Sequence, residues 1–485
     1  MIEFIIKLHP EIVIKSNSVR KRQTKLLERN LKTILVQVEP SVRVNNNFDH
    51  LTVRCESDSE TLRQKLIDRL SCIPGIVNFS EMQSSKFTTL DDIYQQVKDV
   101  YASQLENKTF SVRVRRMGSH DFTSIEAERY IGGGLNQLVA SAKVQLKKPD
   151  MVVNLEVKRD LLIMVRHTHA GMGGFPLPSQ SDVLSLISGG YDSAVASYLM
   201  IRKGLRTHYV FFNLGGAAHE TGVREMAHLI WHKYSLSHKV KFVSVNFAPV
   251  VDEILEKIDN GLMGVVLKRM MMRAACKVAE NLGIKAIVTG ESIGQVSSQT
   301  IANLNAIDRV TDMLILRPLI YHDKQQIIDI AKQIGAEDIA KSMPEYCGVI
   351  SRKPTINAVL SDVLANEDNF DFAVLDSVVQ QAKVLDIRTI DYQADQQAHV
   401  IEQLSELPPN AIVLDIRSPE ETDLKPLAIA DREIIELPFF RLSSQFANLD
   451  QNKTYYFYCD QGVMSRLQAL VLQEQGFTNV AVYRP

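Results

Sequence analysis

The sequence predicts a multidomain protein in which α+β domains at the N-terminus are followed by a doubly wound α/β domain and a smaller α/β domain. Three observations lead to this prediction. The chain has 485 residues, which is too long for a single hydrophobic core. A Gly/Pro-rich connector, GMGGFPLPSQ at 171–180, separates two different rhythms of strands and helices. A further α/β unit begins with AIVLDIR at 411–417, after the linker LSELPPN at 404–410.

The first predicted unit covers residues 1–75. Residues 2–8 alternate like a strand, and 16–35 show apolar residues near helical spacing with a basic surface that includes Lys21 and Arg22. Strand-like runs near 41–54 and a helix at 59–70 complete a small α+β domain.

The second predicted unit covers residues 76–170. It contains a helix near 89–104, the strand TFSVRVRR at 109–116, a helix over about 123–142 and a hairpin within 151–167. Arg113, Arg115 and Arg116 give the first of these strands a basic face. That face is either a solvated sheet surface or a surface that contacts nucleic acid phosphates, and the sequence favours neither.

Charge is unevenly distributed between the two halves of the chain. The net charge is only −2, but residues 1–175 contain 26 Lys/Arg against 20 Asp/Glu, and the remainder contains 29 against 37. A basic N-terminal half is expected of a module that binds a polyanion, although a solvated surface would give a similar excess.

The third predicted unit covers residues 171–395. Short apolar strands (DVLSLI, HYVFFN, KFVSVNF, KAIVTG, ILRPLI) alternate with helical segments, which is typical of a parallel, doubly wound sheet. A polar stretch over roughly 355–405 is expected to be helical. The last unit, 404–485, reads as a small α/β domain of its own.

Composition excludes several classes of protein. Apolar content of 45% and charged content of 23% are ordinary for a soluble protein, and no window approaches ~18 uncharged apolar residues, so we expect a cytoplasmic protein without a membrane partner. Five cysteines without a CxxC pair argue against a disulfide scaffold, a zinc ribbon or an iron-sulfur cluster. His228 and His232 stand four apart but have no evident third ligand, so no metal site from side chains alone is expected.

The loop SGGYDS at 188–193 lies between a predicted buried strand and a predicted helix. Glycines there let the backbone approach a ligand, and a helix N-terminus favours an anion such as pyrophosphate. No Gly-Lys-Ser/Thr follows, which excludes a Walker A loop, and GxGxxG is absent. The form SGGxDS is typical of PP-loop ATP pyrophosphatases, although a capped glycine turn would give a similar string.

Three later segments fit a nucleotide pocket at the strand ends. LKRMMMR at 267–273 offers Lys268 and Arg269, TGESIGQVSSQT at 289–300 is a polar loop after a strand, and RPLIYHDKQQI carries Arg317 and Lys324. Lys324 is the lysine that we expect to pair with phosphate, with a solvated helix lysine as the alternative.

Cys459 is predicted to end the strand TYYFYC and to open a loop before a helix. N–H groups in such a loop can stabilise a thiolate nucleophile. The pattern resembles the single-domain rhodaneses, in which the loop holds a cysteine persulfide, and VLDIRSPEE with Asp415 and Arg417 resembles their other motif. A cysteine phosphatase needs Arg after five residues, whereas six separate Cys459 from Arg466; a buried structural cysteine is the remaining alternative.

Taken together, the motifs resemble the tRNA 4-thiouridine synthetase (tRNA sulfurtransferase) family in its long, rhodanese-bearing form. The resemblance extends from PEIVIKS at 10–16 and RMGSHDFTSIEAERYIGGGLN at 116–136, which is similar to THUMP domains, to MPEYCGVISRKPT at 343–355. It implies a ferredoxin-like domain at 1–75, a THUMP domain at 76–170, a PP-loop ATP pyrophosphatase domain at 171–395 and a rhodanese-like domain at 404–485.

The resemblance also implies residue roles. The uridine at tRNA position 8 would be adenylated on O4, with Asp192 and Lys324 critical and Mg²⁺ accompanying ATP. Cys459 would carry the persulfide, and Cys347 would resolve it as a Cys347–Cys459 disulfide. The tRNA would contact Lys21, Arg22, Arg113, Arg115 and Arg116. The ATP-binding residues would be Leu186, Ile187, Ser188, Gly189, Gly190, Asp192, Ser193, Lys268, Gly290 and Gln299.

The partners implied are tRNA, a cysteine desulfurase as sulfur donor, a reductant for the disulfide, and the sulfur-carrier protein of thiazole synthesis in thiamine biosynthesis. Two other classes fit the same nucleotide loop. A PP-loop amidotransferase or tRNA-lysidine-type ligase would use an amine and needs no rhodanese-like domain. An RNA-binding module with a vestigial nucleotide fold would not convert ATP to AMP.

Overall fold

The structure is a computed structural model that describes residues 1–485 except 48–49, 215, 344–352, 391–401, 418 and 461–462. The chain divides into two compact units. The first comprises Met1–Ser179 with Arg202–Gly204, and the second comprises Gln180–Ile201 with Leu205–Pro485. Among the described residues, no helix is long and apolar enough to span a membrane.

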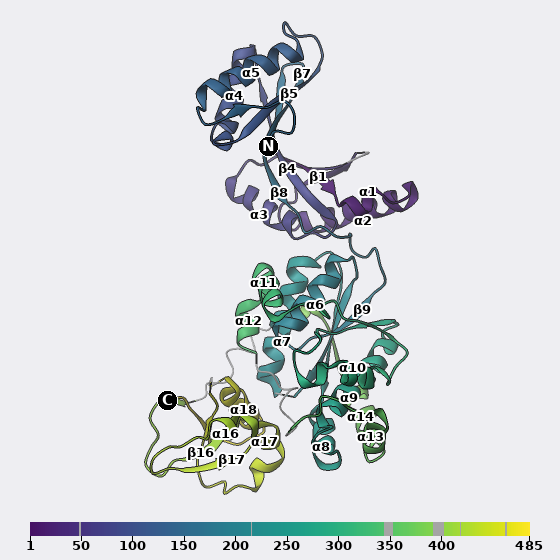
Figure 1. Cartoon of the computed structure of the whole chain (residues 1–485), viewed down its shortest axis with the longest axis vertical. Helices are drawn as coiled ribbons and strands as arrows, with labels where there is room; N and C mark the ends of the chain where they lie inside the picture. Colours follow the sequence, from purple (N-terminus) through teal and green to yellow (C-terminus); the bar gives the residue numbers. More distant parts are fainter. Residues whose placement is uncertain (48–49, 215, 344–352, 391–401, 418, 461–462) are drawn as a thin grey trace. The chain divides into compact units, whose positions relative to one another are not determined.

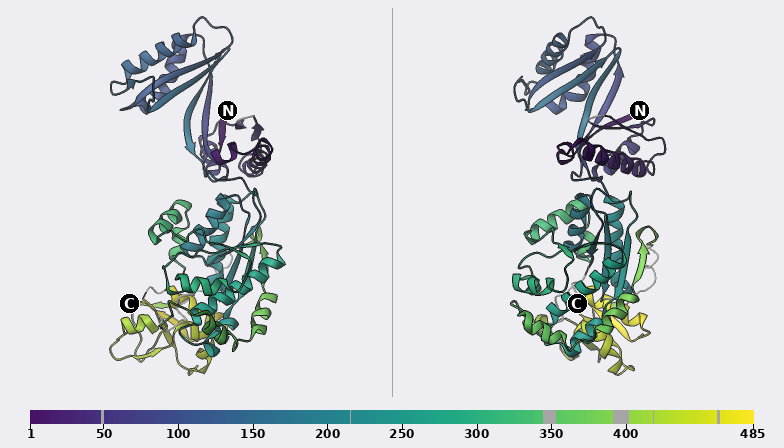
Figure 2. Two further views of the ribbon diagram at one scale, coloured as in Figure 1. Left: turned by 45° about the vertical axis from the view of Figure 1, so that its right-hand side comes forward. Right: turned by 90° about the vertical axis from the view of Figure 1, so that its right-hand side faces the viewer.

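The first unit is built on one eight-stranded sheet, in the order β2-β3-β1-β4-β8-β7-β5-β6. Strands β4 and β8 are long neighbouring strands, and Figure 2 shows both running between a half that carries α2 and α3 and a half that carries α4 and α5. The elements are β1 (Ile2–Leu8), α1 (Pro10–Val13), α2 (Asn17–Leu35), β2 (Arg43–Asn46), β3 (Leu51–Cys55), α3 (Glu60–Ser71), β4 (Ile76–Lys86), α4 (Leu90–Tyr101), η1 (Ser103–Leu105), β5 (Thr109–Met117), α5 (Ser124–Leu138), β6 (Lys143–Val144), β7 (Met151–Lys158) and β8 (Leu161–Ala170).

Local sequence explains several of these elements. Helix α5 begins after a capping box: the Thr123 hydroxyl accepts the backbone N–H of Glu126, and the Glu126 carboxylate accepts the backbone N–H of Thr123. Strand β5 alternates as its sequence predicts, with Val112 and Val114 buried and Arg113 exposed. The predicted hairpin is the antiparallel β7–β8 pair, in which Lys158 lies opposite Leu161.

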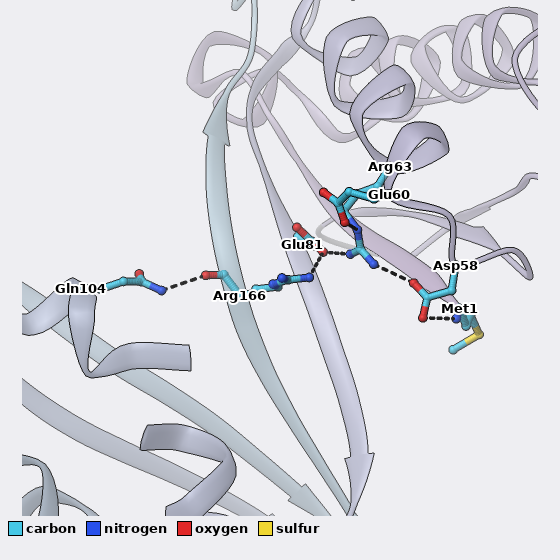
Figure 3. A network of polar contacts seen from close by, with 7 residues as sticks. All are labelled: Met1, Asp58, Glu60, Arg63, Glu81, Gln104 and Arg166. Carbon is cyan, nitrogen blue, oxygen red and sulfur yellow. Dashed lines mark hydrogen bonds and ion pairs between the residues drawn. The ribbon is translucent and has the colours of Figure 1, made fainter. Parts of the chain in front are cut away.

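A polar network joins β4, β8 and α3 in the first unit (Figure 3). The Glu81 carboxylate, 2% exposed, forms an ion pair with Arg63, and its Oε1 lies 3.6 Å from Nη1 of Arg166. Arg63 also lies 2.6 Å from Asp58, which in turn pairs with the N-terminal amine of Met1 at 3.3 Å. Two guanidinium groups therefore compensate one buried carboxylate where the long strands meet the helix.

The second unit contains a six-stranded sheet of order β13-β12-β9-β10-β11-β14. Its first five strands pair in parallel, as predicted, and its core includes the buried face of α9. The elements are β9 (Val183–Leu186), α6 (Tyr191–Arg202), β10 (Thr207–Asn213), α7 (Gly216–Tyr234), β11 (Lys241–Asn246), α8 (Ala248–Lys257), α9 (Met263–Asn281), β12 (Ala286–Val288), η2 (Ser297–Gln299), α10 (Ile301–Asp308), β13 (Leu314–Leu316), α11 (Lys324–Ile334), α12 (Glu337–Lys341), α13 (Leu360–Glu367), α14 (Phe372–Gln380), β14 (Lys383–Asp386) and η3 (Ile387–Thr389).

The order of these strands creates a switch point. The chain goes from β9 to β10 and β11 on one side and then returns to β12 on the other side of β9. In open α/β sheets a ligand binds outside the carboxyl ends of the strands at such a point. A ligand site is therefore expected between the loops after β9 and β12. Figure 1 labels β9 and α6, the two elements that the first of these loops connects.

One expectation for this unit was wrong. The segment 355–405 is not helical throughout, because Lys383–Asp386 form β14, which pairs with β11 in the antiparallel direction. This strand lies at the edge of the sheet, and its pairing with a distant strand overrides the local pattern.

A five-stranded parallel sheet, β15-β19-β18-β16-β17, is formed by the C-terminal residues. Its core contains Leu414, Phe446 and Phe457, each fully buried. The elements are β15 (Gln403–Leu404), β16 (Ile412–Asp415), α16 (Pro419–Leu424), β17 (Glu433–Glu436), α17 (Phe439–Gln445), η4 (Phe446–Asn448), β18 (Tyr455–Tyr458), α18 (Val463–Glu474) and β19 (Val480–Tyr483).

Candidate active site

The SGGYDS loop connects the end of β9 to the start of α6. Gly189 has a φ of +82°, and a Cβ added there would lie 2.8 Å from Sδ of Met343. The Ser193 hydroxyl accepts the N–H of Ser188 at 3.2 Å and donates to the carbonyl of Gly190 at 3.1 Å. The N–H groups of the first turn of α6 have no intrahelical partners, so this end of the helix favours an anion.

Asp192 and Lys324 are brought together at this loop, although they are 132 residues apart in the sequence. Lys324 Nζ lies 3.1 Å from both carboxylate oxygens of Asp192 and 5.7 Å from the centre of the Tyr191 ring. The side-chain amide of Gln295 donates to the same carboxylate at 2.9 Å. Because Lys324 is half-exposed, its ammonium group can leave this carboxylate and pair with an incoming phosphate instead.

Gly290 lies against the start of α6 from the other side of the switch point. A Cβ at this position would lie 2.7 Å from the carbonyl carbon of Asp192 and 2.9 Å from the N of Ser193. Both atoms belong to the backbone and cannot rotate away, so only glycine allows the two loops this close approach. In the same loop the Gln299 side chain, 8% exposed, accepts the N–H of Ser292 at 3.2 Å.

The structure separates the two cations of LKRMMMR. Arg269 is 1% exposed, and its guanidinium forms a two-pronged ion pair with Glu367 at 2.6 and 2.9 Å. The suggestion that Arg269 serves the nucleotide pocket is therefore wrong, because it ties α9 to α13 in the core. Lys268, on a different face of α9, is only half-buried. Arg317 is likewise occupied, by Glu291 at 2.8 Å and by Asp308.

His219 on α7 is a buried histidine that the sequence analysis did not single out. The residue is 3% exposed, and its ring packs edge-on against Phe211 with 4.9 Å between ring centres. Burial lowers the pKa of His219 to about 4, so the imidazole is neutral near pH 7. No local motif marks this histidine, because its ring contact comes from Phe211 on β10, the strand that packs against α7.

Cys459 follows directly after β18 and lies at the carboxyl edge of the C-terminal sheet. It is 9% exposed, and its Sγ accepts the backbone N–H of Ser465, in the first turn of α18, at 3.4 Å. The Ser465 side chain is fully buried, and its hydroxyl has no partner among the described residues. A sulfur held by a first-turn N–H is placed where a helix end stabilises negative charge.

Asp415 and Arg417 lie at the same sheet edge, because β16 pairs in parallel with β18 and Asp415 is opposite Tyr458. Arg417 is 2% exposed and binds both carboxylate oxygens of Asp415, at 2.9 and 2.6 Å. These hydrogen bonds raise the pKa of the Arg417 guanidinium above its usual value. Arg417 also reaches Asp460, the neighbour of Cys459, at 3.3 Å. Arg466, the residue weighed for a phosphatase, is exposed.

Among the described residues, Cys276 differs from Cys459 in its surroundings. Cys347 lies outside the described residues. Cys276 is 8% exposed, donates to the Thr311 hydroxyl, and has its pKa raised by burial, which keeps it in the unreactive thiol form.

The five basic residues expected to contact tRNA lie on the first unit, and four of them are exposed. Lys21 and Arg22 lie in α2 and are both exposed. The Arg113 side chain, 47% exposed, lies 3.7 Å from Glu128, and that of Arg115, 79% exposed, lies 4.0 Å from Glu156. Exposed pairs this long contribute little to stability, so these arginines can exchange a carboxylate for a phosphate at low cost. Arg116 is half-buried, with its guanidinium 5.7 Å from the Phe122 ring centre.

The fold and the two sites define the class of protein: a multidomain α/β protein with a nucleotide loop at the switch point of one sheet and a cysteine at the carboxyl edge of another. Four family profiles match successive parts of the chain. They are described as ThiI ferredoxin-like domain (residues 3–80), THUMP domain (87–165), Thiamine biosynthesis protein (ThiI) (178–372) and Rhodanese-like domain (379–484).

Full-length relatives then give the family. A tRNA sulfurtransferase of Tolumonas auensis is 59% identical over 99% of both chains, and one of Colwellia psychrerythraea is 56% identical over the whole of both. The chain therefore belongs to the tRNA sulfurtransferase (ThiI) family, in its form with a C-terminal rhodanese-like domain. A solved 4-thiouridine synthetase, crystallised with RNA and bound ATP, shares the fold over 80% of this chain and 99% of its own, with a TM-score of 0.66 and 23% identity.

Proposed function

We propose that this protein uses ATP and a persulfide on Cys459 to convert the uridine at tRNA position 8 into 4-thiouridine. The observation that carries the proposal is the presence in one chain of two complementary sites. One is the Asp192–Lys324 pair at a helix start, which suits a triphosphate, and the other is Cys459 at a helix start, which suits a nucleophilic sulfur.

In the first step, O4 of the uridine attacks the α-phosphorus of ATP. An O–P bond forms, N3 of the base loses its proton to solvent, the bond to the β-phosphate oxygen breaks, and pyrophosphate leaves. The loop of Ser188, Gly189 and Gly190 would hold the phosphates through backbone N–H groups, and Lys324 would leave Asp192 to neutralise charge on the leaving pyrophosphate. Leu186, Ile187, Ser193, Lys268, Gly290 and Gln299 would line the ATP site.

Mg²⁺ would enter with ATP. This ion is usually held by substrate phosphates and one or two carboxylates, and Asp192 is a carboxylate placed to contribute. Among the described residues, no group of three or more His, Cys, Asp or Glu forms a metal site.

In the second step, the terminal sulfur of the Cys459 persulfide attacks C4 of the adenylated base. A C–S bond forms, the C–O bond breaks, and AMP leaves. The thiolate of Cys347 would then attack Sγ of Cys459, so that the sulfur stays on the base and a Cys347–Cys459 disulfide forms. A reductant supplies two electrons to reopen it, and a cysteine desulfurase reloads Cys459.

The ferredoxin-like and THUMP domains would grip the tRNA by its shape and backbone, through Lys21, Arg22, Arg113, Arg115 and Arg116. The family description as a thiamine biosynthesis protein supports a second outlet for the persulfide, the sulfur-carrier protein of thiazole synthesis. Both outlets require reduced thiols, which fits the cytoplasm.

Mass analysis of nucleosides tests this function. Unmodified tRNA is incubated with the protein, ATP, a cysteine desulfurase and cysteine, and we expect 4-thiouridine and AMP in equal amounts. Lys324→Ala should lower the rate at least 100-fold, whereas Lys277→Ala, at a lysine of similar exposure on α9, should not. AMP without thiolated tRNA would favour an amine-using ligase, and thiolation without ATP would contradict the proposal.

A further inference from the structure

The segment Arg317–Asp323, which precedes Lys324, is firmly attached to the loop after β12. The N–H of Ile293 donates to the carbonyl of Ile320 at 3.1 Å, and the Ser292 hydroxyl donates to the carbonyl of His322 at 2.7 Å. The two residues on either side of Tyr321 are thus fixed to the neighbouring loop. The backbone at Tyr321 is held in place without any contribution from its side chain.

The side chain of Tyr321 is nevertheless exposed to solvent. Its exposed fraction is 80%, compared with 48% for Tyr130 and 39% for Phe372. The ring packs on the His322 ring, with 4.5 Å between ring centres and 30° between planes, which orients it in advance. Burial in the core does not explain a large aromatic ring presented in this way.

Two exposed apolar side chains lie on the loop that is hydrogen-bonded to the segment of Tyr321. Ile293, on the loop fixed to Ile320, is 52% exposed, and Val296 is 40% exposed. Lys324, three residues after Tyr321, binds Asp192, and Gln295 from the same loop as Ile293 binds Asp192 as well. The two segments that carry these exposed side chains thus also carry Lys324 and Gln295, which bind Asp192 where ATP is expected to react.

We propose that Tyr321, with Ile293 beside it, is a stacking platform that holds the target uridine of the tRNA, unstacked from its neighbours, next to Lys324 and Asp192. The inference rests on the proposed function and adds the contact that selects and orients the base. A base cannot be modified while it is stacked inside folded RNA, so the enzyme has to replace the lost stacking. Aromatic rings replace it for any base, and a rigid ring does so at low entropic cost.

Single-turnover adenylation and thiolation test the platform in the full chain. Loss of base–aromatic stacking predicts that Tyr321→Ala lowers both rates about 5- to 150-fold, with ATP affinity unchanged. Tyr321→Phe keeps the ring and should remain within about twofold of the wild type. Leu314→Ala is the matched control, because Leu314 is 60% exposed at the opposite end of β13 and should have no effect.

Crosslinking provides a readout that is independent of rate. Transfer RNA carrying 4-thiouridine at position 8 is bound to the wild-type protein and irradiated with near-ultraviolet light, and we expect a crosslinked peptide that contains Tyr321 or Ile293. The inference is overturned if Tyr321→Ala adenylates and thiolates normally, if Tyr321→Phe is as impaired as Tyr321→Ala, or if ATP affinity falls in parallel. Normal adenylation with slow thiolation would also overturn it, since the surface would then serve sulfur delivery. A wild type that does not thiolate tRNA would instead refute the proposed function itself.

Discussion

Gly290→Ala tests whether the close approach of two backbones forms the nucleotide site. The Cβ of an alanine at 290 would lie 2.7 Å from the carbonyl carbon of Asp192, whereas ordinary contacts begin at 3.4 Å. The loop after β12 and the start of α6 must therefore separate by about 0.7 Å. Overpacking of this kind typically costs ~1–3 kcal/mol of stability.

The separation should affect catalysis more than folding. It displaces Gln295 and Asp192 relative to each other, and a misplacement of ~1 Å can lower a rate about 100-fold. We expect kcat/KM for ATP in tRNA-dependent AMP formation to fall roughly 10- to 100-fold.

The matched control is Gly264→Ala in α9. Nothing lies within 4 Å of a Cβ at that position, and alanine favours helix, so activity should be unchanged and stability equal or slightly higher. Both variants are compared with the wild type in steady-state assays over ATP concentration and by thermal unfolding. A Gly290→Ala enzyme with wild-type kcat and KM for ATP would refute the reasoning.

Three further predictions concern the buried histidine, the polar network and the basic strand. The pKa of His219 is near 6.5 in the unfolded chain and is lowered by burial to about 4 in the folded one, so the free energy of unfolding should be highest above pH 6.5 and fall by on the order of 3 kcal/mol towards pH 4. In chemical denaturation, the stability of His219→Gln should depend clearly less on pH, and an identical pH dependence would exclude this histidine as the cause. Glu81→Gln leaves two arginines without their shared carboxylate, and calorimetry should show that the first unit is less stable by ~3 kcal/mol. Glu60→Gln, which removes an exposed carboxylate, is the control and should leave the stability unchanged. Combined Arg113→Ala and Arg115→Ala should reduce the salt-dependence slope of tRNA binding by about two, while Lys383→Ala on the second unit should not; an unchanged slope would mean that neither arginine contacts phosphate.

The sequence predicted the nucleotide loop well because its chemistry is local. A buried strand, two glycines and a helix start occupy one continuous stretch around Ser188–Ser193, and the structure has these elements in that order. The periodicities likewise indicated the parallel strands and the alternating face of β5, which are confirmed.

Long-range partners could not be predicted in this way. Arg269 reads as an available cation until Glu367, 98 residues further on, is found beside it in the core. The strand at 383–386 has only four residues and depends on pairing with β11. The burial of His219 and the exposure of Tyr321 both depend on packing between different segments, which local patterns do not reveal.

The most direct test of the account is a single turnover by protein that already carries its sulfur. The protein is loaded with a desulfurase and cysteine, purified from both, and mixed with unmodified tRNA and ATP, and 4-thiouridine is counted by nucleoside mass analysis. The account predicts up to one 4-thiouridine per protein from the wild type and from Cys276→Ala, and none from Cys459→Ala. Formation of 4-thiouridine by loaded Cys459→Ala protein would contradict the central claim that Cys459 carries the transferred sulfur.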